Sequence, residues 1–284
     1  MGDVPDDFVA DLRRLRSWPG LTDSLWRSPP LVRATHGRLW DVIAKLLPPS
    51  SSRVLDVGCG VGALTLEAAR AGHEVIGIDP DPGALAIAAR SAVDARPGQV
   101  TYHRADVDAW EHDAADFDVV VTCRTLHHVP DPAASLGRMR RWLRPGGRLV
   151  CVDFVHDRFD RRAARWLAQV RGLLEAAGRA CGDAPLPADP DAATDRIEWE
   201  WQQEHVVDHH LNTSSDIEEP LSRLFRPEDM SWHAYLYWDL LVGLDMGDDR
   251  LEATGALIAD WETSMIEAGL LAPVLFSFAG RARA

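Results

Sequence analysis

Three glycines and one carboxylate lie close together in the segment VLDVGCGVGALT. Gly58, Gly60 and Gly62 alternate with other residues, which is typical of a turn that lets a nucleotide approach the backbone closely. Asp56 comes shortly before the first glycine. Although Gly58, Gly60 and Ala63 fit the spacing of a dinucleotide loop, a carboxylate at this point would repel a pyrophosphate in a partly buried site. The charge therefore favours a ligand that has a positive group and no phosphate.

Histidines supply the candidate groups for proton transfer. His127 and His128 follow an apolar run, and His205 and His209 lie in a segment dense in Trp and His. On a helix His205 and His209 would share one face, because they are spaced by one turn. A neutral imidazole can accept a proton from a hydroxyl or ammonium nucleophile. We therefore take His127, His128 and His209 as candidate catalytic bases, with a purely structural role as the alternative. No set of ligands at a recognisable spacing predicts a metal site.

The elements that must position these residues follow from an alternation of apolar strands and helices. Strands are predicted at 53–59, 74–80, 99–107, 117–129 and 148–154. Helices are predicted at 31–47, 62–72, 82–95 and 131–143, the last with Asp131 as its N-cap. Buried strands that alternate with helices are typical of an open parallel sheet. We predict an α/β fold: a Rossmann-like, seven-stranded, mostly parallel sheet with helices on both faces.

The alternation ends after the fifth strand. Later segments predict a helix at 160–178, a helix at 215–225 that begins with a capping box of Ser215 and Glu218, an aromatic strand at 231–244, a helix at 250–269 and a last strand at 272–283. The expected organisation is N-terminal cover helices at 1–30, a core at 31–155, a lid inserted after the fifth strand at 156–212, and the C-terminal part of the core sheet at 213–284.

Composition limits the classes of partner. The chain has 284 residues, of which 46% are hydrophobic, and its formal net charge is −14 at pH 7. Nucleic-acid binders gain most of their affinity from Lys and Arg, so we expect no nucleic-acid partner. We also expect no signal peptide and no membrane span, because the N-terminal segment is acidic and no apolar run is long enough to cross a bilayer. The four dispersed cysteines suit a cytoplasmic protein with reduced thiols.

The glycine segment resembles motif I of the class I S-adenosylmethionine-dependent methyltransferases, whose pattern D-x-G-x-G-x-G it matches at every fixed position. Four further stretches match in the family's order, namely VIGIDPDP, HRADVDAW, FDVVVTCRTLHHVPDP and LRPGGRLVCVDF. The resemblance covers about residues 31–155, which it makes the S-adenosylmethionine-binding core. It implies S-adenosyl-L-methionine as the cofactor and methyl transfer as the reaction. The positive sulfonium and ammonium groups of this cofactor are also compatible with the negative charge of Asp56 in the glycine segment.

The resemblance implies roles for individual residues. Asp79 would accept hydrogen bonds from both ribose hydroxyls, with a role as helix N-cap alone as the alternative. Asp106 would hold the adenine amino group, and the nearby Asp108 is the alternative for that role. Asp56 would help at the methionine end, directly or through the glycine loop. Cys123 and Arg124 lie where the family's chain passes the methionine part of the cofactor. The full set of cofactor-binding residues that we expect is Asp56, Gly58, Cys59, Gly60, Asp79, Pro80, Asp106, Val107, Cys123 and Arg124.

The substrate is predicted to be a small organic molecule. Trp199, Trp201, Trp232 and Trp238 fall in or near the expected lid and would suit the walls of an organic pocket, although packing of the lid is the alternative. The fourth strand lacks the N/D-P-P-Y/F motif of nucleic-acid amino methyltransferases. We therefore expect a bacterial, cytoplasmic monomer or homodimer that methylates oxygen or nitrogen, with specialised biosynthesis as its setting. Open alternatives are a cofactor-binding cyclase or sensor without methyl transfer, a nicotinamide oxidoreductase, and a methyltransferase acting on a protein or carrier-bound substrate.

Overall fold

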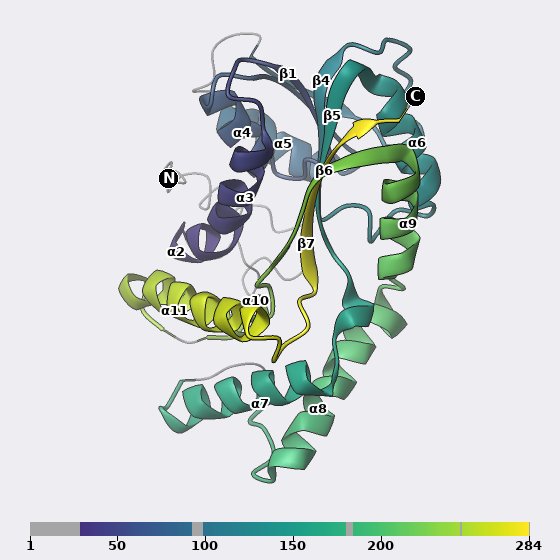
Figure 1. Ribbon diagram of the computed structural model, residues 1–284. Coiled ribbons are helices and arrows are strands. Elements are labelled where there is room, and N and C mark those ends of the chain that lie inside the picture. The colour runs from purple at the N-terminus through teal and green to yellow at the C-terminus, as the bar shows by residue number, and fades with distance from the viewer. Residues whose placement is uncertain (1–28, 93–98, 180–183, 245, 284) are drawn as a thin grey trace.

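The computed structural model describes residues 29–92, 99–179, 184–244 and 246–283, and its centre is a 7-stranded sheet (Figure 1). The strands lie in the order β3-β2-β1-β4-β5-β7-β6. Their bounds are β1 (Arg53–Val57), β2 (Glu74–Asp79), β3 (Val100–Arg104), β4 (Phe117–Cys123), β5 (Leu143–Phe154), β6 (Phe225–His233) and β7 (Leu275–Ala282). Neighbouring strands from β3 to β5 pair in parallel, and β7 runs antiparallel to β5 and β6. The predicted mostly parallel sheet of seven strands is confirmed.

Helices cover both faces of the sheet. Their bounds are α2 (Pro29–Val32), α3 (Arg38–Leu46), α4 (Ala63–Arg70), α5 (Pro82–Ser91), α6 (Pro132–Trp142), α7 (Arg161–Ala176), α8 (Pro190–Gln202), α9 (Ser214–Leu224), α10 (Tyr237–Val242) and α11 (Asp248–Glu267). Helices α3 and α4 pack on one face of the sheet, and α6 and α9 pack on the other (Figure 1).

The central strands are apolar along their whole length because both of their faces are covered. Successive side chains of a strand point to opposite faces. In β4, Val119 and Val121 therefore join the core under α3 and α4, whereas Val120 joins the core under α6 and α9. All three are buried. This double burial produces the continuous apolar runs from which the parallel sheet was predicted.

The helix starts explain how the chain turns at the ends of the strands. The Asp131 side chain accepts a hydrogen bond from the Ala134 N–H at 2.9 Å, which confirms the predicted N-cap of α6. The helix predicted at 31–47 begins at Pro29 and includes a π-helical turn, η1 (Arg33–Gly37). Residues 1–28 lie outside the described part of the chain, so the cover helices expected there stay a prediction.

The segment after β5 forms a pair of helices, α7 and α8, beyond the carboxyl ends of the parallel strands (Figure 1). The Trp201 ring of α8 stacks on Phe159 with 4.1 Å between ring centroids, and its Nε1 donates to the His156 carbonyl at 3.1 Å. A wide π-helical turn, η4 (Gln203–Asp208), follows α8. The helix predicted at 160–178 is confirmed, and the role of residues 156–212 as a lid stays a prediction.

Several local expectations were wrong. The strand predicted at 117–129 ends at Cys123, so Arg124, His127 and His128 lie in the loop that follows it and not in the strand. The aromatic segment 231–244 is not one strand: only its first residues belong to β6, and α10 begins at Tyr237. The cause is Glu262 of α11, whose carboxylate accepts the backbone N–H groups of Tyr235, Leu236 and Tyr237 at 2.8–3.0 Å and so turns the chain into a helix. The capping box of α9 involves Thr213 and Asp216 instead of the expected pair.

Within the described residues, every helix is too short or too polar to cross a bilayer. Cys59, Cys123 and Cys151 are free thiols, and Cys181 lies outside the described residues.

Candidate functional site

The glycine loop connects β1 to α4 in a conformation that only glycine adopts easily. Gly58, Gly60 and Gly62 have φ angles of 73°, 53° and 80°, in the left-handed region that a Cβ disfavours. A Cβ on Gly58 would lie 2.2 Å from Thr125 Oγ1, and one on Gly62 would lie 2.5 Å from the Tyr102 hydroxyl. Gly60 has open space at the same point. The loop therefore needs glycine for its backbone at each position and for close packing at two.

Asp79 ties the glycine loop to the end of β2. One of its carboxylate oxygens accepts the Gly60 N–H at 2.8 Å, and the other accepts the Asp81 N–H at 2.9 Å. The backbone N–H of Gly58 donates to the Ile78 carbonyl at 2.9 Å, which fixes the same two segments together. These contacts hold the end of β2 against the loop and leave the Asp79 carboxylate on the wall of a pocket.

Asp56 is buried beneath the glycine loop and connects the end of β1 to α4. It is only 4% exposed, and the Thr65 hydroxyl of α4 donates to it at 2.5 Å. Burial raises the pKa of Asp56 to about 6; the Thr65 hydrogen bond opposes this shift, and the Asp79 charge adds to it. Asp56 does not line the pocket, so its described contacts act through the loop.

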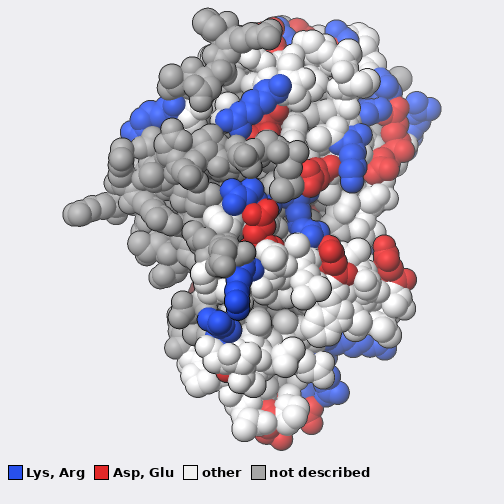
Figure 2. Space-filling view, turned by 90° about the vertical axis from the view of Figure 1, so that its left-hand side faces the viewer, with Lys and Arg blue, Asp and Glu red and all other residues white. Residues whose placement is uncertain are grey.

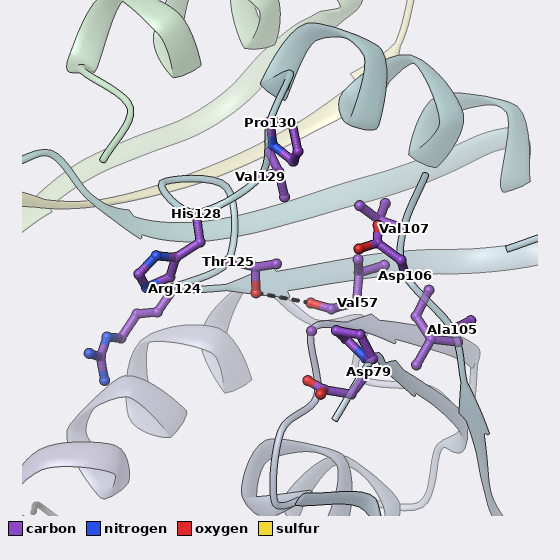
Figure 3. Close-up of a pocket in the computed structure, with 13 residues that line it drawn as sticks. Val57, Asp79, Ala105, Asp106, Val107, Arg124, Thr125, His128, Val129 and Pro130 are labelled. Carbon is purple, nitrogen blue, oxygen red and sulfur yellow. Dashed lines mark hydrogen bonds between the residues drawn. The ribbon is translucent and has the colours of Figure 1, made fainter. Parts of the chain in front are cut away.

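The pocket, of about 300 Å³, lies at the carboxyl ends of β1, β2, β3 and β4, where the strand order reverses (Figure 3). Open α/β sheets bind ligands at this switch point. Seven of the expected site residues line it, namely Gly58, Asp79, Pro80, Asp106, Val107, Arg124 and His128. The expected residues that do not line it are Asp56, Cys59, Gly60, Cys123, His127 and His209.

The charges around the pocket are mixed. Asp79 and Asp106 form one side, and Arg124 and His128 lie on the other (Figure 3). Arg124 is the only Lys or Arg among the lining residues, and it points away from the two carboxylates in Figure 3. The acidic side therefore suits hydroxyl, amino or cationic groups and disfavours phosphate. Among the described residues, no group of three or more His, Cys, Asp or Glu side chains is arranged to hold a metal ion.

The loop after β4, which carries Arg124 and His128, is held from two sides. The buried carboxylate of Asp153 in β5 accepts the N–H groups of Thr125 and Leu126 at 3.2 and 2.8 Å. Asn212, which precedes α9, donates from Nδ2 to the carbonyls of Leu126 and Val129 at 2.9 and 2.7 Å. Loops that carry site residues on a rigid scaffold are a common way to position chemistry.

The three candidate histidines lie in a row. His127 is 3% exposed, and its Nδ1 lies 2.5 Å from the Asp153 carboxylate. Its ring centroid is 4.1 Å from that of His128, which in turn is 6.3 Å from that of His209. Desolvation, and then the nearby His127, lower the pKa of His128 to about 4. The His128 ring is therefore neutral at physiological pH and can accept a proton.

His205 and His209 do not share a helix face. The π-helical turn η4 changes the spacing, and His205 turns inward, where its Nδ1 lies 3.0 Å from the Trp201 carbonyl. His209 instead faces His128. The expectation that His205 and His209 share one face of an α-helix is therefore wrong. The fold itself, and not helical spacing, brings His209 next to His128.

Sequence reasoning missed several residues of this site. Thr125, Asp153 and Asn212 are the polar ones, and the apolar lining residues are Val57, Ile78, Ala105, Val129 and Pro130. Asp153 could have been identified from the sequence, because a carboxylate inside the apolar run VCVDF is expected to be buried and then needs hydrogen-bond donors. Asn212 had none, since its partners are more than 80 residues away along the chain.

A protein-family model described as a methyltransferase domain matches residues 31–182, which is more than half of the chain. The ubiquinone biosynthesis O-methyltransferase of Xylella fastidiosa (strain 9a5c) is 41% identical over 110 residues, which cover 38% of this chain and 44% of that protein. The protein of the same name from Aromatoleum aromaticum is 41% identical over 147 residues, which cover 49% of this chain and 61% of that protein. The chain thus spans about half the length of these curated relatives.

Among solved structures, geranyl diphosphate C-methyltransferase from Streptomyces coelicolor A3(2), in complex with Mg²⁺, geranyl diphosphate and S-adenosyl-L-homocysteine, matches 87% of this chain and 79% of its own. The TM-score is 0.54 at 15% identity, so this likeness concerns the fold alone. The matched residues 31–182 include the glycine loop, Asp79 at the end of β2, Asp106 after β3 and the strands β1 to β5. The chain belongs to the methyltransferase-domain family.

Proposed function

We propose that this protein transfers a methyl group from S-adenosyl-L-methionine to an oxygen or nitrogen of a small organic molecule. The observation that carries the proposal is the pocket at the strand switch point. It combines the glycine loop with the carboxylates of Asp79 and Asp106, and the one Lys or Arg among its lining residues, Arg124, points away from both carboxylates (Figure 3). An adenosyl ligand with a sulfonium and an ammonium fits this charge pattern, and a dinucleotide does not.

The residues of the pocket fit the parts of this cofactor. We assign Asp79 to the ribose hydroxyls and Asp106 to the adenine amino group, with Pro80 and Val107 as the apolar walls beside them. Asp56 keeps the glycine loop in place through its buried contacts. When bound, S-adenosyl-L-methionine supplies an electrophilic methyl group on sulfur. The protein's task is then mainly alignment, which contributes roughly 7–11 kcal/mol when two reactants are held in a near-attack geometry.

His128 is the candidate base that lines the pocket. Its lowered pKa leaves the ring neutral, and His127, held by Asp153, packs against it. We assign proton removal from the acceptor to His128. His127 would position the His128 ring by packing against it, and His209 would contact the same ring from another side. The O-methyltransferase names of the curated relatives favour oxygen as the accepting atom.

The remaining expectations concern setting and partners. We propose a bacterial cytoplasmic enzyme, monomeric or homodimeric, with a role in specialised biosynthesis and no nucleic-acid partner. The net charge of −14 supports the last point, as does the mixture of acidic and basic side chains over the face shown in Figure 2.

A transfer assay tests the proposal. The full chain is incubated with methyl-tritiated S-adenosyl-L-methionine and extracts of small molecules, and label is followed into organic-soluble products and protein bands. Label in a small product, lost in Asp79→Ala and reduced in His128→Ala, supports the proposal. Cofactor binding without transfer to any acceptor would favour a cyclase or sensor, and label in a protein band would point to a macromolecular substrate.

A further inference from the structure

Arg124 occupies an unusual backbone position at the mouth of the pocket. It directly follows β4 and has a φ of 54°, in the left-handed region that costs a non-glycine residue energy. Its side chain lines the pocket beside His128 (Figure 3). Strain of this kind tends to persist at functional sites, where the surrounding structure fixes the residue in place.

The guanidinium of Arg124 lies on an aromatic wall. Its central carbon is 4.7 Å from the ring centroid of Trp238 and 5.8 Å from that of Tyr235. The wall is rigid: both rings are buried, and Tyr235 stacks on Phe154 at 5.0 Å. Glu262 fixes the backbone of this segment by accepting hydrogen bonds from three successive N–H groups. The planar cation is thus held in one orientation before any ligand arrives.

The side chain of Arg124 makes no hydrogen bond in the described part of the chain, whereas its backbone N–H donates to the Val152 carbonyl at 2.8 Å. Its Nε is buried and makes no hydrogen bond, and its side chain forms no ion pair there. Arg148 also has a buried Nε without a hydrogen bond, but its Nη2 pairs with Glu228 at 2.7 Å, and Arg171 pairs with Glu175 at 3.0 Å, so these two arginines differ from Arg124 in having an ion pair. A buried donor without a partner is costly, so an unpaired guanidinium in a pocket indicates a ligand that carries the acceptor.

Titratable groups of both signs lie around Arg124, although none of the described ones forms an ion pair with it. Burial, and then Arg124 itself, lower the pKa of His36 to about 3, so that ring is neutral at physiological pH. Asp239 and Glu204 are acidic groups on neighbouring elements, and desolvation raises the pKa of each above its usual range. The positive charge of Arg124 opposes the rise at Asp239, so this carboxyl group lies within electrostatic range of the guanidinium but forms no ion pair with it.

We propose that Arg124 binds an anionic oxygen group, a carboxylate or a phenolate, on the acceptor substrate. The inference rests on the proposed function, since it places the acceptor next to the cofactor. The side chain points away from Asp79 and Asp106 (Figure 3), and its aromatic wall comes from the segments around β5 and α10, away from the adenosine side. A planar guanidinium matches a carboxylate with two parallel hydrogen bonds. Beside a phenolate it would also favour the deprotonated, nucleophilic form.

The test compares two probes of the same shape and different charge. Benzoate and benzamide are titrated into the full chain, with and without S-adenosylhomocysteine, and binding is followed by NMR. We expect benzoate to bind about tenfold more tightly or better, as a charged hydrogen-bond pair implies. Arg124→Gln should remove this preference, and Arg124→Lys should keep part of it. Arg196→Gln is the matched control, because Arg196 lies 4.9 Å from the Trp199 ring but outside the pocket, and it should leave the preference unchanged.

Two outcomes would overturn the proposal. One is equal binding of benzoate and benzamide to the wild-type chain, or an unchanged preference in Arg124→Gln. The other concerns the cofactor's own carboxylate, for which S-adenosylhomocysteine is compared with its decarboxylated analogue. A selective loss of S-adenosylhomocysteine binding in Arg124→Gln would assign the guanidinium to the cofactor instead. Absence of S-adenosylhomocysteine binding to the wild-type chain would contradict the proposed function, whereas the benzoate preference measured without it still reports on Arg124.

Discussion

Replacing Gly58 with alanine should destabilise the protein more than the same change at Gly60, although both glycines have a left-handed backbone. The φ angles are 73° and 53°, and alanine in this region costs about 1–2 kcal/mol. Only at Gly58 does the new Cβ collide with a neighbour, at 2.2 Å from Oγ1 and 2.6 Å from Cγ2 of Thr125. Overpacking of this kind costs about 1–3 kcal/mol more.

The expected loss in free energy of unfolding is therefore about 2–5 kcal/mol for Gly58→Ala and about 1–2 kcal/mol for Gly60→Ala. At about 2 °C per kcal/mol for a chain of this size, the melting temperature should fall by about 4–10 °C and about 2–4 °C. Urea and thermal unfolding of the ligand-free chain measure both values, so that cofactor binding does not contribute.

A second substitution tests the cause. Thr125→Ala removes the two colliding atoms and costs about 1 kcal/mol through the lost hydrogen bond to the Val57 carbonyl. The double variant Gly58→Ala/Thr125→Ala should lose about 1–3 kcal/mol less free energy of unfolding than the sum of the losses in the two single variants. Equal destabilisation by Gly58→Ala and Gly60→Ala, or strict additivity in the double variant, would refute the reasoning.

Three further predictions concern charge, loop order and proton transfer. Burial raises the pKa of Asp56 from 3.8 to about 6, so the folded state binds this proton more tightly than the unfolded state. The protein therefore loses stability as the pH rises from about 4 to about 6. Asp56→Asn should remove that loss of about 3 kcal/mol and should be more stable than the wild type in urea unfolding at pH 8. Asn212→Ala removes the hydrogen bonds to Leu126 and Val129, and hydrogen exchange should speed up in residues 124–130 but not in β1. His128→Ala should lower the methyl-transfer rate about 10²–10⁴-fold and remove an acidic limb near pH 4, below which the wild-type ring is protonated; an unchanged pH–rate profile would exclude His128 as the base.

The fold and the acidic side of the pocket, with the glycine loop, were predictable because their determinants are local. The glycines of the loop, the carboxylates that end β2 and follow β3, and the buried strands each lie within one short segment of sequence. Asp131 could be named as an N-cap for the same reason, since its partner Ala134 is only three residues away.

The side of the pocket formed by the loop after β4 depends on contacts between distant segments, and there the sequence was less informative. The helix α10 exists because Glu262 reaches back to Tyr235 and its neighbours, and the segment by itself has the aromatic pattern of a strand. Asp153 and Asn212 fix the loop after β4 from two different elements. The unpaired state of Arg124 likewise appears only once the surrounding wall is known.

The central claim is that the pocket binds a cationic adenosyl cofactor without phosphate, and calorimetry with S-adenosylhomocysteine and NAD⁺ tests it most directly. We predict stoichiometric binding of S-adenosylhomocysteine and no heat with NAD⁺. Asp79→Ala should weaken binding about 10–100-fold through the loss of charged hydrogen bonds, and the exposed Asp113→Ala should not. Binding of NAD⁺ by a chain that gives no heat with S-adenosylhomocysteine would contradict the account.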